Sequence, residues 1–175
     1  MNQFCLPYCL IIEEGIYEHL DEVLTECIPE ITEQKVMIVT EPALQDIMGN
    51  YLEEIKKDLP KSELFLIEEN SFDQAMKLAK AIYTNGFQTI IGFGGGKVLD
   101  VAKYAGFVGK VPYICLPTTL SNDSLASPVA VLDIDKDTRK TLSCKIPTGI
   151  IVDVNIIMNA PTMQLKSGIG DTISK

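Results

Sequence analysis

Short runs of apolar residues alternate along the chain with longer stretches in which apolar residues recur every three or four positions. Cys9–Glu13 and Lys35–Thr40 have the length and the apolar content of buried strands. The first of these runs is followed by a helical pattern that comprises Ile16, Leu20, Val23, Leu24 and Cys27. A second helix is expected to begin at Pro42, because proline suits the first turn of a helix. This alternation predicts βα units on a parallel sheet.

The same alternation continues through the middle of the chain. Further strands are expected at Leu64–Ile67, Thr89–Gly92 and Val111–Leu116, and a helix from about Lys97 to Phe107. Ser71 and Gln74 form a capping-box pattern, in which each side chain bonds a free amide at the start of a helix. The expected inward face of that helix comprises Phe72, Ala75, Met76, Ala79, Ile82 and Tyr83.

Two short strands of a different kind follow. Val129–Leu132 and Thr138–Leu142 flank a polar turn and predict a small β-hairpin, and Gly149–Val152 predicts a last strand. The expected fold class is therefore α/β, with a Rossmann-like, mostly parallel sheet flanked by helices and a small β-hairpin beside it.

The composition is that of an ordinary globular domain with a buried core. Of the 175 residues, 46% are hydrophobic and 22% are charged. The formal net charge of -9 argues against binding to nucleic acid or to an anionic membrane, because those surfaces attract clustered Lys and Arg. No apolar run approaches the roughly 18 residues of a membrane helix, and the first residues lack a signal-peptide pattern.

The number and setting of the cysteines indicate the cellular compartment of the protein. There are five, an odd number, and most lie in apolar stretches: Cys5, Cys9, Cys27, Cys115 and Cys144. This pattern is typical of reduced, buried thiols rather than of a disulfide framework. We therefore expect a cytoplasmic protein.

Three consecutive glycines, Gly94, Gly95 and Gly96, follow a buried strand and precede a helix. Their backbone can approach a ligand closely, and the free amides at the start of the helix can bind a phosphate. A tight turn that simply requires glycine is the alternative, since a glycine-rich turn alone is a weak motif. Glu41, after the second strand, could bond the ribose hydroxyls of a dinucleotide or could be a carboxylate at a helix N-terminus beside Pro42.

The residues after the glycines extend this motif. The sequence from Gly94 to Lys103 has the form Gly-Gly-Gly-x-x-x-Asp-x-Ala-Lys. It resembles the motif of the iron-containing alcohol dehydrogenase superfamily, which includes glycerol dehydrogenase, glycerol-1-phosphate dehydrogenase and dehydroquinate synthase. The resemblance implies an NAD or NADP cofactor. It implies cofactor contacts at Gly94, Gly95, Gly96, Lys97, Val98, Leu99 and Asp100.

A second block, Pro117–Pro128, is a polar loop at the carboxyl end of a strand, where open α/β sheets bind ligands. By itself it could be a capped surface loop. Its similarity to the same family implies further cofactor contacts at Thr118, Thr119, Leu120, Ser121 and Ser127. The similarity also implies that Asp123 contacts the substrate as a catalytic residue. Glycerol-1-phosphate dehydrogenases commonly have glycine after this aspartate, whereas this chain has Ser124.

A third block, Ser167–Lys175, contains Asp171 after two glycines. By itself, this aspartate could be a carboxylate favoured by a helix dipole. The block is similar to the family segment whose aspartate is the first protein ligand of the catalytic Zn²⁺ or Fe²⁺. In the family the other two ligands are histidines from a following all-helical domain, and a catalytic zinc site normally uses about three protein ligands. The only histidine here, His19, lies in the first helical pattern, where we expect a structural role.

These blocks predict how the chain is divided. We expect residues 1–160 to form a nucleotide-binding domain and residues 161–175 to begin a helical metal-binding domain that this chain lacks. The expected function is the cofactor-binding half of an NAD(P)-dependent, metal-assisted oxidoreductase. It would interconvert a small polyol or polyol phosphate and its ketone, as a homo-oligomer when full length. A dehydroquinate-synthase-like cyclase and a non-catalytic nucleotide-binding module are the alternatives.

Overall fold

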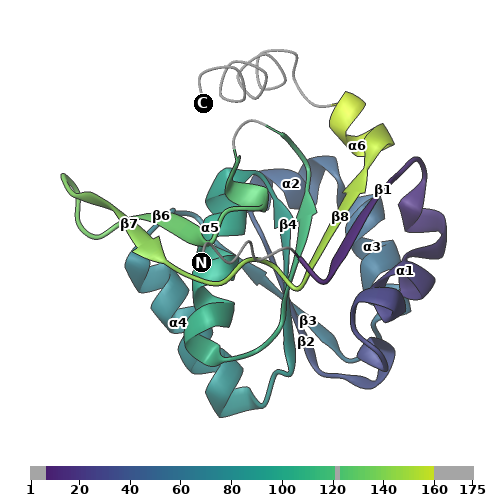
Figure 1. The fold of residues 1–175 in the computed structure, drawn as a ribbon, viewed down its shortest axis with the longest axis horizontal. Helices are drawn as coiled ribbons and strands as arrows, with labels where there is room; N and C mark the ends of the chain where they lie inside the picture. The colour runs from purple at the N-terminus through teal and green to yellow at the C-terminus, as the bar shows by residue number, and fades with distance from the viewer. Residues whose placement is uncertain (1–6, 121–122, 160–175) are drawn as a thin grey trace, which may run out of the picture.

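A six-stranded parallel sheet forms the centre of the computed structural model, which describes residues 7–120 and 123–159 (Figure 1). The strand order is β1-β8-β5-β4-β2-β3. The strands are β1 (Cys9–Glu13), β2 (Val36–Thr40), β3 (Ser62–Leu66), β4 (Thr89–Gly94), β5 (Tyr113–Pro117) and β8 (Gly149–Asp153). The predicted α/β fold with a Rossmann-like sheet is confirmed.

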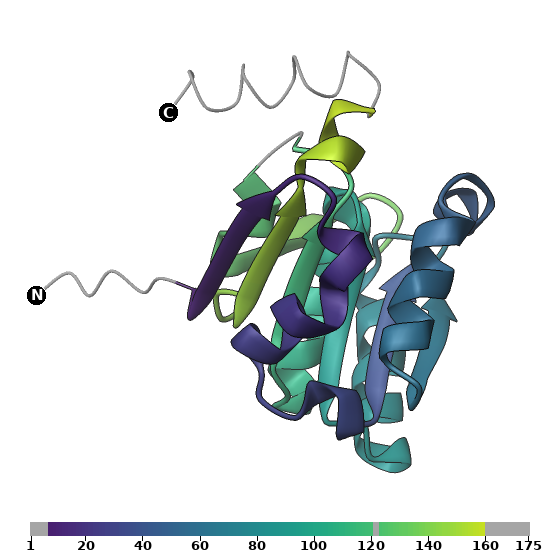
Figure 2. The same ribbon diagram turned by 90° about the vertical axis from the view of Figure 1, so that its right-hand side faces the viewer.

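Helices cover both faces of this sheet. Figure 2 shows α1 (Leu20–Cys27) and α3 (Gly49–Asp58) in front of one face, and α4 (Phe72–Asn85) and α5 (Gly96–Gly109) cover the other. Because successive side chains of a strand point to opposite faces, β2 contributes Ile38 to the core under α3 and Val39 to the core under α5. The shorter helical elements are η1 (Ile16–His19), η2 (Ile31–Glu33), α2 (Pro42–Ile47), η3 (Asp123–Leu125) and α6 (Val154–Met158).

The predicted β-hairpin is present outside the sheet. It consists of β6 (Val129–Asp133) and β7 (Arg139–Ser143), which pair antiparallel and lie beyond α5 in Figure 1. Ala130 and Leu132 point into the same core as α5, so one face of β6 is buried. The hairpin therefore packs against α5, the helix that begins at the glycines.

Two details differ from the sequence-based expectations. In α4, Met76 and Tyr83 are 37% and 88% exposed, whereas Leu78 is buried, so the predicted inward face was wrong at these positions. The helix buries Ala75, Leu78, Ala79 and Ile82, one narrow stripe of period 3.6, and Tyr83 lies one residue beyond it. The helix expected from Pro42 is also divided into α2 and α3 at Met48.

The cysteines were predicted incorrectly in part. Cys9 at the start of β1 and Cys27 at the end of α1 form a disulfide, with their Cα atoms 5.3 Å apart. The helix returns along the sheet antiparallel to β1, which brings the two residues together across 18 positions of sequence. Cys115 and Cys144 are free thiols, as expected. No helix in the part of the chain that the structure describes is long and apolar enough to cross a bilayer.

Candidate functional site

The glycine run forms the corner between β4 and α5. Gly94 is the last residue of β4, and Gly95 is the N-cap of α5, where it offers no side-chain acceptor to the first-turn amides. The first helical hydrogen bond joins the Leu99 amide to the Gly95 carbonyl at 3.0 Å. The amides that precede Leu99 in the helix therefore have no partner within it and are available to an anion.

Gly94 and Gly95 are glycines for different reasons. A Cβ atom on Gly94 would lie 2.7 Å from side-chain atoms of Val98, so the packing of the helix against the strand excludes a larger residue. A Cβ atom on Gly95 would meet only the hydroxyl of Thr119, at an ordinary 3.4 Å. The space above Gly95 is thus open, and a ligand can approach its backbone closely.

The second sequence block lies directly beside this corner. Strands β4 and β5 are neighbours with Gly94 opposite Pro117, and the Thr118 amide donates to the Gly94 carbonyl at 3.0 Å. Thr118 is buried and Thr119 is partly exposed next to Gly95. Two blocks that are separated in sequence are therefore joined at the carboxyl edge of the sheet.

A third segment reaches the corner from β2. In the strand order, β2 has β3 on one side and β4 on the other, so the direction of chain progression reverses between β2 and β4. Open α/β sheets bind ligands at such a point. Glu41 follows β2 there, and its carboxylate forms an ion pair with Lys97 in the first turn of α5. The Lys97 ammonium also lies 3.4 Å from the Glu68 carbonyl oxygen, after β3.

A cavity of about 290 Å³ lies between the start of α5 and the hairpin. Four of the predicted site residues line it: Gly96, Lys97, Asp100 and Ser127. The other lining residues were not predicted: Asn70, Ser124, Val129, Val131 and Arg139. Asn70 follows β3 at the same edge of the sheet, so the rule that ligands bind at the carboxyl ends of strands could have indicated it. Nothing in the sequence of the hairpin distinguishes Arg139 as a site residue.

Two cations, Lys97 and Arg139, line the cavity, and each has a carboxylate partner. Lys97 pairs with Glu41, and Arg139 donates through Nε to Asp133 at 2.6 Å. The hydrogen bond from Arg139 holds the pKa of the Asp133 carboxyl below its usual value, although Arg139 is exposed and Asp133 is only partly buried. Asn70 donates to the Val131 carbonyl at 2.8 Å, while its buried Oδ1 accepts no hydrogen bond from the part of the chain described.

The remaining predicted residues differ in their surroundings. Val98 and Leu99 are buried in the core. The Val98 amide is available to a cofactor, whereas the Leu99 amide already donates to the Gly95 carbonyl. Asp100 is buried and hydrogen-bonded within the protein, and Leu120 is partly exposed. Asp123 begins η3. Ser121 and Asp171 lie outside the described residues.

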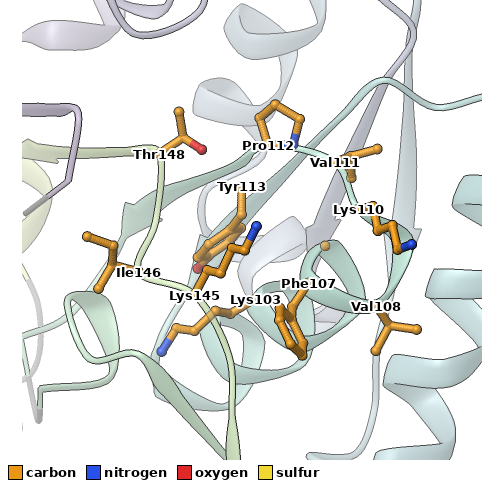
Figure 3. Close-up of a pocket in the computed structure, with 11 residues that line it drawn as sticks. Lys103, Phe107, Val108, Lys110, Val111, Pro112, Tyr113, Lys145, Ile146 and Thr148 are labelled. Atoms are coloured by element: carbon orange, nitrogen blue, oxygen red, sulfur yellow. The ribbon is translucent and has the colours of Figure 1, made fainter. Parts of the chain in front are cut away.

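A larger cavity lies elsewhere. It has a volume of about 630 Å³ and lies at the other end of α5, where Phe107, Lys110, Tyr113 and Lys145 are among its lining residues (Figure 3). In residues 7–120 and 123–159, no three His, Cys, Asp or Glu side chains are grouped so that they could hold a metal ion. His19 lies at the end of η1, with Nε2 3.9 Å from a Glu13 carboxylate oxygen.

Comparison with known proteins agrees with this geometry. The sequence profile of the iron-containing alcohol dehydrogenases matches residues 11–161, which is most of the chain and includes the glycine corner. The chain belongs to the iron-containing alcohol dehydrogenase family. The family predicted from the three sequence blocks is therefore confirmed.

Curated relatives within this family are glycerol-1-phosphate dehydrogenases (NAD(P)+). The enzyme of Methanosphaera stadtmanae is 35% identical over 97% of this chain and 47% of its own length. That of Thermofilum pendens is 28% identical over 97% of this chain and 48% of its own length. The chain thus spans about half the length of the curated relatives it matches.

Solved structures of the family share the fold. A probable glycerol dehydrogenase from Sinorhizobium meliloti superposes with a TM-score of 0.83 at 23% identity, over 99% of this chain and 46% of that one. Sulfoacetaldehyde reductase from Bifidobacterium kashiwanohense, determined with NAD+, also gives a TM-score of 0.83, at 20% identity, over 99% of this chain and 52% of that one.

Proposed function

We propose that this chain is the cofactor-binding half of an NAD(P)-dependent, metal-assisted dehydrogenase that acts on a small polyol or polyol phosphate. The names of its curated relatives support the reaction class and the cofactor. The observation that carries the proposal is the open space above Gly95, which lies beside Thr119 and at the N-terminus of a helix of 14 residues. A pyrophosphate group needs such a combination of close backbone approach and free amides.

The parts of the dinucleotide are assigned to different sides of the corner. The pyrophosphate would bind the amides at the start of α5. Glu41, which follows β2 and pairs with Lys97 of that helix, would then accept hydrogen bonds from the hydroxyls of the adenosine ribose. The nicotinamide end would then extend toward the cavity of about 290 Å³ beside Ser127. The ion pair between Glu41 and Lys97 keeps the carboxylate at this position, where it would accept hydrogen bonds from the ribose hydroxyls.

When bound, the cofactor would supply the redox chemistry as a hydride acceptor, and the residues of this chain would bind and orient it. Asp171 is proposed as a ligand of Zn²⁺ or Fe²⁺, which when bound would polarise the substrate hydroxyl and lower its pKa. Asp123 is proposed to contact the substrate. Both roles rest on the resemblance of the sequence blocks that contain these residues.

The test is a titration of the 175-residue chain with NADH, followed by the fluorescence of the reduced nicotinamide. Gly95→Ala should weaken binding by about tenfold, because its methyl group would occupy the space needed by the pyrophosphate. The matched control is Gly49→Ala, since a Cβ atom there meets nothing within 4 Å. Equal affinities in the two variants, or no binding by the unsubstituted chain, would refute the proposal.

Turnover distinguishes the two enzyme classes. In a form of the protein that contains the helical half, net production of NADH from glycerol-1-phosphate supports the dehydrogenase. A cyclase of the dehydroquinate-synthase type would use the cofactor transiently, without net reduction, and this result would replace the proposed reaction.

A further inference from the structure

A buried lysine and a buried aspartate form an ion pair beneath the candidate site. Lys103 is 1% exposed, and its ammonium donates to the Asp100 carboxylate at 3.3 Å. Its other two contacts are backbone carbonyl oxygens, Ser124 at 2.5 Å and Val129 at 2.8 Å. The three donors of the ammonium group are therefore all used within the protein.

Asp100 completes the cluster from the same helix. Its Oδ1 accepts a hydrogen bond from the Ser124 hydroxyl at 2.6 Å, and its Oδ2 accepts one from the Val131 amide at 3.2 Å. Two adjacent charges on α5 thus bind the segment 124–131 at three of its residues, namely Ser124, Val129 and Val131. A buried, fully hydrogen-bonded network of this kind fixes one arrangement of the groups that it joins.

The segment that is held contains Ser127 and directly follows Asp123, the two residues of this loop proposed to act on the ligands. Asp123 directly precedes Ser124, and Ser127 lies between Ser124 and Val129 and lines the cavity. The opposite wall of that cavity is the first turn of α5, the helix that carries Asp100 and Lys103. The network therefore joins α5 directly to the loop that lines the same cavity.

From this geometry we infer that Asp100, Lys103 and Ser124 are positioning residues, which hold the segment 123–131 against α5 and so set the places of Ser127 and Asp123. The inference rests on the proposed function for the roles of those two residues. Ser124 makes a contact that the glycine common in glycerol-1-phosphate dehydrogenases could not make, because glycine has no hydroxyl to donate to Asp100. This chain therefore has an additional point of attachment at the residue next to Asp123.

The test removes only that attachment. Ser124→Ala should weaken NADH binding to the 175-residue chain by about fivefold, since a hydrogen bond to a charged group is lost. Ser124→Gly should weaken it further, because glycine also frees the backbone. Ser143→Ala is the matched control. It removes a hydroxyl from an exposed position of β7 and should leave the affinity unchanged.

Hydrogen exchange supplies a second readout. Peptide amides of residues 123–131 should exchange faster in Ser124→Ala than in Ser143→Ala. If folded Ser124→Ala binds NADH as tightly as the unsubstituted chain, even with a lower Tm, the hydroxyl is only structural and the inference is wrong. If the unsubstituted chain does not bind NADH, the proposed function fails, and unchanged exchange in residues 123–131 would then overturn the anchoring as well.

Discussion

At the scale of single residues, the glycines between β4 and α5 meet two different requirements, although they form one motif in the sequence. One requirement is close packing of the helix on the strand, and the other is open space for a ligand. The predictions from sequence treated Gly94, Gly95 and Gly96 alike, as a place where a phosphate approaches the backbone. The structure assigns the first of them to packing, because Val98 fills the space where its side chain would be, and leaves the second open. The sequence could not show this difference, because it depends on how closely α5 approaches β4.

Gly94→Ala should lower the free energy of unfolding by about 1–3 kcal/mol, because an added methyl group overlaps a buried side chain. Urea denaturation of Gly94→Ala, of Val98→Ala and of the variant that carries both changes measures these free energies of unfolding. In the background of Val98→Ala, which removes the overlapping Cγ1 and Cγ2 atoms but keeps the Cβ atom, the cost of Gly94→Ala should be smaller by about 1 kcal/mol. Equal costs in the two backgrounds would contradict the assignment of Gly94 to packing.

At the scale of helices and strands, the pattern of apolar residues correctly predicted the elements whose residues are deeply buried. The expected strands correspond to β1–β8 with small differences at their ends, and all five apolar residues of the first helical pattern are buried. The pattern misled in α4, because an exposed helix face can carry Tyr83 without requiring its burial. It also could not reveal Lys103 as buried, since the carbonyl groups that receive its ammonium come from a loop and a hairpin distant in sequence.

The start of α4 offers a test at this scale, since the predicted cap is confirmed in part. The Ser71 hydroxyl accepts from the Gln74 amide at 3.3 Å. Ser71→Ala should lower the free energy of unfolding by about 1 kcal/mol, because the amide loses its partner. Ser71→Asn, which keeps an acceptor, is the control and should retain most of the stability. A loss of equal size in both variants, measured by urea denaturation, would mean that the cap does not stabilise α4.

At the scale of the whole molecule, the described part of the chain contains the proposed cofactor site, and no His, Cys, Asp or Glu side chains in that part are grouped as a metal site. The glycine corner, Glu41 and the cavity beside Ser127 come from β2, β4, β5 and the hairpin, all between residues 36 and 143. The chain spans about half of its curated relatives, and the one metal ligand that the sequence predicts, Asp171, follows these elements. Cofactor binding and metal-assisted chemistry should therefore be separable.

This separation predicts how the 175-residue chain responds to metal removal. Treatment with EDTA should leave its affinity for NADH unchanged, because we propose that the amides of α5 and the residues around Gly95 bind the dinucleotide without a metal. The same chain should oxidise glycerol-1-phosphate no faster than the buffer does, with or without added Zn²⁺ or Fe²⁺, since a catalytic zinc site takes about three protein ligands. Fluorescence titration and NADH absorbance measure the two quantities on one sample. Metal-dependent turnover by this chain would mean that it assembles a complete metal site, and an EDTA-sensitive affinity would mean that a metal takes part in binding the cofactor.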